Sequence, residues 1–89
     1  MKVTEMTLDK MYLLRQFITS YQLSLNTMRT QKAHDGRSAD IETGISMEWI
    51  WLHRLTSDQQ AFLEPYGYTD YINQLAGFAH ENGYDLTGN

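Results

Sequence analysis

The side chains in this 89-residue sequence that come closest to catalytic groups lack the partners that catalysis needs. His80-Glu81 begins like the two-histidine zinc motif of metalloproteases, but Tyr84 stands where the second histidine should be. Ser46 follows Gly44 by two residues, yet the second glycine of a nucleophile elbow is absent and the segment reads as helix. The sequence has no glycine-rich phosphate loop and no cysteine. We therefore expect no enzyme, no cofactor and no metal site.

Basic and aromatic residues alternate along the first part of the chain, a combination that suits a small phosphate ligand. Residues 1–38 carry six basic and three acidic side chains, whereas residues 39–89 carry one basic and eight acidic. A nucleotide needs cations for its phosphates and aromatic faces for its bases. The predicted ligand site consists of Tyr12, Arg15, Lys32, Arg37 and Trp51. Six cations are too few for a surface that binds duplex nucleic acid.

The acidic second part of the chain favours a different function, the docking of this protein onto a basic surface of another protein. Tyrosines beside the acids would add contact area and a hydroxyl at a low entropic cost. The interface predicted on this alternative consists of Glu64, Tyr66, Tyr68, Asp70 and Glu81, with both tyrosines on an exposed turn. The partner would be a host defence or nucleic-acid enzyme, as for a small phage inhibitor of the anti-CRISPR or host-takeover type.

The spacing of apolar residues predicts a long helix over residues 8–31. Its seam advances in alternating steps of three and four residues, which only a helix places on one face: Met11, Leu14, Ile18, Tyr21, Leu25 and Met28. Thr7 is suited to cap this helix, with Asp9 in the first turn. Phe17 and four other apolar residues lie off the seam and widen the hydrophobic surface. This width predicts a homo-oligomer.

Three further helices are predicted after the Asp35-Gly36 turn. The first covers about residues 39–55 and packs against the long helix as an antiparallel hairpin. Thr56 and Gln59 form a capping box that opens a short helix, which Pro65 closes. The last helix begins at a cap at 69 or 70 and ends near residue 82, before Gly83.

The expected fold is therefore all-α, a single helical domain over residues 1–89 made of an antiparallel hairpin with two shorter C-terminal helices. The predicted hairpin core consists of Leu14, Ile18, Leu25, Ile45 and Leu52. No run of about 18–20 apolar residues and no secretory signal is present in the sequence, so we expect a cytoplasmic protein without a membrane partner.

The segment from Asp35 to Trp51 resembles the helical-hairpin domain of phage cyclic-nucleotide sponges, which counter the CBASS and Thoeris immune systems. Those hairpins contain an acid-x-Arg turn, here residues 35–37, and a second helix that reads Thr-x-Leu-Glu-x-Ala-x-Met-Trp. Thr43, Ile45, Ile50 and Trp51 fit this pattern, whereas Ser46 and Glu48 depart from it. The resemblance implies a cytoplasmic oligomer that sequesters cyclic oligonucleotides without cleaving them.

Overall fold

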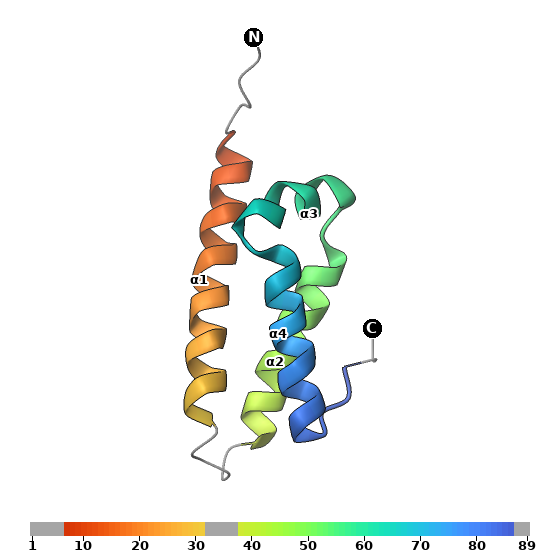
Figure 1. Ribbon diagram of the computed structural model, residues 1–89. Helices are drawn as coiled ribbons and strands as arrows, with labels where there is room; N and C mark the ends of the chain where they lie inside the picture. Colours follow the sequence, from red (N-terminus) through yellow and green to blue (C-terminus); the bar gives the residue numbers. More distant parts are fainter. Residues whose placement is uncertain (1–6, 32–37, 87–89) are drawn as a thin grey trace.

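The computed structural model describes residues 7–31 and 38–86, which form a bundle of helices without a strand in this part of the chain. Helix α1 spans Leu8–Gln31, α2 Ser38–Arg54, α3 Ser57–Leu63 and α4 Tyr68–Asn82, and the short 3-10 helix η1 covers Glu64–Tyr66. Helices α1 and α4 run in one direction and α2 runs in the opposite direction (Figure 1). The all-α prediction is confirmed. The predicted Asp35-Gly36 turn lies outside the described residues.

Helix α4 packs against both α1 and α2, so the core is shared by three long helices rather than by the first two alone. Five large side chains in it have no exposed surface, and they come from all four α-helices: Phe17, Leu52, Leu63, Tyr71 and Leu75. Burying each of them contributes about 1.5–3 kcal/mol relative to an exposed position. Among the described residues, no helix has the length and hydropathy needed to cross a membrane.

The buried side of α1 differs from the predicted seam. Phe17, which the seam left out, is fully buried, whereas Ile18 is 38% exposed. The prediction that Ile18 belongs to the hairpin core is therefore wrong, while Ile45 and Leu52 are buried as predicted. Leu14 and Leu25 are half-buried.

The physical reason is that α1 carries two overlapping apolar stripes, which share Tyr21 and Met28. One stripe contains Phe17 and the other contains Ile18. Both satisfy helical spacing, so the spacing alone does not rank them. Because α4 and α2 together cover α1 from the side of Phe17, that stripe becomes the centre of the contact.

The ends of the C-terminal helices follow local rules with one exception. The capping box before α3 is confirmed, because the Thr56 hydroxyl accepts from the Gln59 N–H at 3.1 Å and the Gln59 amide oxygen accepts from the Thr56 N–H at 2.8 Å. Gly83 closes α4 in the left-handed conformation, as predicted (φ 74°). The predicted cap at Thr69 or Asp70 is wrong. Helix α4 begins at Tyr68, directly after Gly67, which has no side chain to cap it.

Candidate interaction face and groove

A buried tyrosine hydroxyl joins the three long helices and sets their relative positions. The Tyr71 hydroxyl of α4 donates to Glu48 Oε1 of α2 at 2.7 Å. Ser24 Oγ of α1 lies 2.7 Å from the Tyr71 hydroxyl oxygen. Because a phenol has one proton and an ionised carboxylate only accepts, Ser24 donates to Tyr71. Burial raises the pKa of Tyr71, so the hydroxyl stays protonated and remains a donor.

Tyr21 extends this cluster to the protein surface. Its ring stacks on Tyr71 with centroids 4.5 Å apart, and its hydroxyl donates to Asp70 Oδ2 at 3.0 Å. Burial, followed by the bond to Asp70, raises the pKa of Tyr21 to about 12. The exposed Asp70 carboxylate is therefore held in place by Tyr21, whose ring packs on the buried Tyr71.

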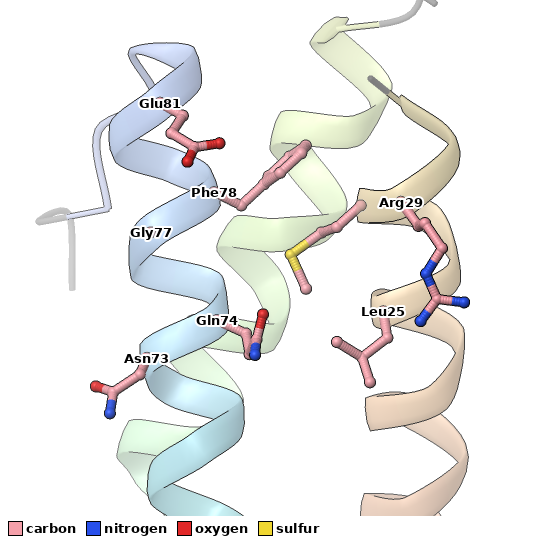
Figure 2. A pocket seen from close by; sticks show the side chains of 8 residues that line it. Leu25, Arg29, Asn73, Gln74, Gly77, Phe78 and Glu81 are labelled. Carbon is pink, nitrogen blue, oxygen red and sulfur yellow. The ribbon is translucent and has the colours of Figure 1, made fainter. Parts of the chain in front are cut away.

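A groove of about 590 Å³ lies between the C-terminal half of α1 and residues 73–81 of α4 (Figure 2). Leu25, Met28 and Phe78 supply its apolar lining, and its polar lining consists of Arg29, Asn73, Gln74 and Glu81. Gly77 lies on the groove without a side chain, and a Cβ added there would meet nothing within 4 Å. Figure 2 shows Arg29 on α1 at one side of the groove and Glu81 on α4 at the other.

The two helices that border the groove carry charges of opposite sign. Arg15 and Arg29 are exposed on α1, and the sequence has no acidic residue from position 11 to position 31. Asp70 and Glu81 are exposed on α4, and the sequence has no lysine or arginine from position 64 to position 82. Neither Arg29 nor Glu81 forms a side-chain hydrogen bond or ion pair with another described residue. Within the described part of the chain, both charges of the groove therefore face solvent without a fixed partner.

Five of the exposed residues of α4 form a strip along the helix, which we call the acidic face. Asp70 and Glu81 are eleven residues apart, about three helical turns, so they lie above one another on the helix. The face consists of Asp70, Asn73, Gln74, Gly77 and Glu81, and all five residues are exposed. The exposed residues Glu64 and Tyr66 of η1 precede its N-terminal end, with Tyr66 42% exposed.

Tyr68 does not belong to this surface, so its prediction as an exposed interface residue is wrong. The side chain is 6% exposed, and its hydroxyl donates to the backbone oxygen of Leu52 at 2.6 Å. Its ring also stacks on Phe17 with centroids 6.5 Å apart. The signal was present in the sequence, because Tyr68, Tyr71 and Leu75 continue one helical stripe in steps of three and four. The turn predicted over residues 65–67 led instead to an exposed position for Tyr68.

The residues predicted to bind a small ligand do not gather in the groove. Tyr12 and Arg15 are exposed one turn apart on α1, whereas Trp51 of α2 is half-buried and packs against the core. Lys32 and Arg37 lie outside the described residues. Arg15 is fourteen residues, or about 21 Å of helix, from Arg29, which does line the groove. Arg29 belongs to the basic residues of α1 but was not among the predicted ligand residues, because the groove that it lines exists only in the tertiary structure.

Within residues 7–31 and 38–86, no cluster of three or more His, Asp and Glu side chains could hold a metal ion. No family model, curated protein or solved structure matches the chain. The function is therefore argued from the groove and the acidic face.

Proposed function

We propose that this chain is a non-catalytic binding protein that docks through its acidic face onto a basic surface of another protein. One observation carries the proposal: four of the five residues expected at such an interface are exposed along η1 and α4, namely Glu64, Tyr66, Asp70 and Glu81. No lysine or arginine interrupts them in the sequence from 64 to 82. Charges of one sign on a single face steer a complementary partner and speed its association.

Two of the three carboxylates are held in position before any partner arrives. Glu64 accepts hydrogen bonds from the backbone N–H and the hydroxyl of Thr69, and these bonds lower its pKa, so it stays ionised. Asp70 accepts from Tyr21. A side chain that is already ordered loses less conformational entropy on binding. Such an array of fixed negative charges can occupy a groove that normally receives nucleic-acid phosphates, which is the expected action of an inhibitor of a nucleic-acid enzyme.

The test is quantitative affinity capture from a bacterial lysate with wild-type protein and two charge variants. The interface variant combines Asp70→Asn with Glu81→Gln, and the control is Asp58→Asn, an exposed acid on α3. We expect one protein to be captured by the wild type and the control, to be released by heparin or duplex DNA, and to be lost with the interface variant. Equal capture by all three proteins would contradict the proposal.

The groove supports a second candidate function, the sequestration of a small anionic nucleotide such as a cyclic oligonucleotide. Arg29 offers a guanidinium for a phosphate, and the amides of Asn73 and Gln74 can pair with base edges. A volume of about 590 Å³ lies within the range of small-molecule sites. It ranks second because the carboxylate of Glu81 on the same groove repels a phosphate.

Calorimetry with cyclic di- and trinucleotides tests this second candidate. Wild-type protein should release or absorb heat, Arg29→Ala should abolish the signal, and Glu81→Gln should strengthen binding because it removes the repelling charge. Absence of heat and of a thermal shift with every nucleotide would eliminate it. Both candidate functions belong to the cytoplasm, where nucleic-acid enzymes and nucleotide signals occur.

A further inference from the structure

The exposed surface around the groove is complementary in charge to itself. The wall formed by α1 carries Arg15 and Arg29, and the wall formed by α4 and η1 carries Glu64, Asp70 and Glu81. The acidic face needs a basic surface, and the α1 wall of another copy of this chain offers two exposed arginines. A patch that is complementary to itself is what a two-fold symmetric dimer requires.

The positions of the charges along the bundle allow such a pairing. Arg29 and Glu81 both line the groove between the parallel helices α1 and α4, and Glu81 lies nearer its C-terminal end than Arg29 does (Figure 2). A two-fold axis parallel to these helices keeps every residue at its level and exchanges the two walls. Arg29 of each copy then faces the C-terminal part of the partner's α4, which carries Glu81.

A second charge pair follows at the other end of α1. Lys10 lies 5.4 Å from the centroid of the Phe62 ring in α3, and Tyr21 bonds to Asp70 in α4. Arg15 stands between Lys10 and Tyr21 on α1, so its level corresponds to that of η1, which carries Glu64. The same axis therefore brings Arg15 opposite the partner's Glu64.

We propose that two copies of this chain associate face to face about an axis parallel to α1 and α4, with α1 of each copy across α4 of the other. The inference rests on the proposed function because it uses the same acidic face, for which a second copy and another basic protein would compete. Apolar side chains lie between the charges: Ile18 is 38% exposed, Leu25 is half-buried, and Met28 and Phe78, which are each 7% exposed, line the groove. Gly77 leaves room for the partner's side chains because it has none of its own.

A mixing experiment with two charge reversals tests this arrangement. Arg29→Glu places two carboxylates at each contact of its homodimer, and Glu81→Arg places two guanidinium groups there, so each variant alone should dimerise roughly ten- to a hundredfold more weakly than wild type. In an equimolar mixture, the introduced carboxylate of one chain meets the introduced guanidinium of the other, and the unchanged Arg29 and Glu81 meet at the second contact. We expect sedimentation velocity to show wild-type dimer, monomer for each variant alone, and recovered heterodimer in the mixture.

Asp58→Lys serves as the control, because this exposed acid lies on α3 away from the groove, and it should dimerise like wild type. Circular dichroism of every variant checks that it is folded. A wild-type protein that is monomeric at tens of micromolar, or a mixture that stays monomeric, would overturn the inference.

A pair of glycine substitutions tests the apolar part of the face independently of charge. Gly44 of α2 and Gly77 of α4 are both helical, and a Cβ added at either would meet nothing within 4 Å. Gly77→Leu should fill the groove and weaken the dimer at least tenfold, whereas Gly44→Leu should leave the dimer unchanged. Equal dimerisation of the two variants would contradict the assignment of the groove to the interface.

Failure of the dimer is distinguishable from failure of the proposed function. A wild-type monomer whose capture of a protein depends on Asp70 and Glu81 would overturn only the dimer. A charge-dependent dimer with equal capture by the interface variant and its control would overturn only the docking onto another protein.

Discussion

Tyr21 and Tyr71 stack with their ring centroids 4.5 Å apart and their planes inclined by 16°, and each hydroxyl donates to a different carboxylate. Tyr71 bonds inward to Glu48 of α2, and Tyr21 bonds outward to Asp70 of the acidic face. The pair therefore connects the core to the surface that we propose as the interface. Changes to either tyrosine should affect stability and the position of that surface together.

Removing the Tyr71 hydroxyl should destabilise the fold. Tyr71→Phe keeps the ring but leaves Glu48 and Ser24 without the oxygen that joins them. A buried polar group that loses its partner costs about 1–3 kcal/mol. Urea denaturation should show this loss, while Tyr66→Phe, on the exposed turn, should leave the free energy of unfolding unchanged. Equal stability of the two variants would refute the role of the cluster.

The buried Tyr71 and the half-buried Tyr21 predict a loss of stability in alkali. Tyrosine ordinarily titrates near pH 10, and folding raises the pKa of Tyr21 to about 12 and that of Tyr71 further. Above pH 10 the unfolded chain releases protons that the folded chain keeps, so the free energy of unfolding falls as pH rises. It should be insensitive to these two groups below pH 10.

Melting temperatures measured on both sides of pH 10, with the absorbance of tyrosinate as a second signal, test this dependence. Tyr21→Phe should flatten the alkaline decline, because it removes one of the protons that folding retains. Tyr12→Phe is the control, since Tyr12 is 64% exposed on α1. An alkaline profile that is identical in all three proteins would rule the explanation out.

Truncation at two neighbouring positions of α1 should lower the free energy of unfolding by different amounts. Phe17→Ala removes a fully buried ring and should cost roughly 3–5 kcal/mol, much of the stability of a small domain. Ile18→Ala should lower the free energy of unfolding by less than Phe17→Ala does, because Ile18 is 38% exposed. Thermal melts compare the stability of the two variants, and Phe17→Leu serves as a less disruptive substitution at position 17. A larger loss of stability for Ile18→Ala than for Phe17→Ala would show that the predicted stripe containing Ile18 is the buried one.

Two glycines with positive φ should differ in their tolerance of a side chain. Gly67 has φ 107°, and a Cβ there would lie 2.9 Å from Cε2 of the Tyr21 ring, which the stack on Tyr71 holds in place. Gly83 has φ 74° and no heavy atom within 4 Å of an added Cβ. Gly83→Ala should cost about 1–2 kcal/mol from its backbone alone.

Gly67→Ala should cost more than Gly83→Ala, because steric overlap adds to the same backbone penalty. The difference between the two free energies of unfolding, measured in urea, gives the cost of the steric overlap. A difference near zero would mean that the Tyr21 ring moves freely, and the proposed anchoring of Asp70 would fail with it.

Local chemistry in the sequence determined the helices and several of their ends. Thr56 and Gln59 specify a capping box through groups three residues apart, and Gly83 specifies a helix end through its own backbone freedom. The acidic strip along residues 64–81 was also visible, because a charge and its helical position are properties of the sequence.

Tertiary packing decided which side of each helix faces inward. Phe17 and Ile18 satisfy the spacing of α1 equally, and the position of α4 selects Phe17. Tyr68 changes from an expected surface residue to a core residue for the same reason. Arg29 and Glu81 lie on opposite sides of a groove that neither helix forms alone. Helical periodicity gives relative angles within one element, whereas burial depends on the direction from which other elements approach.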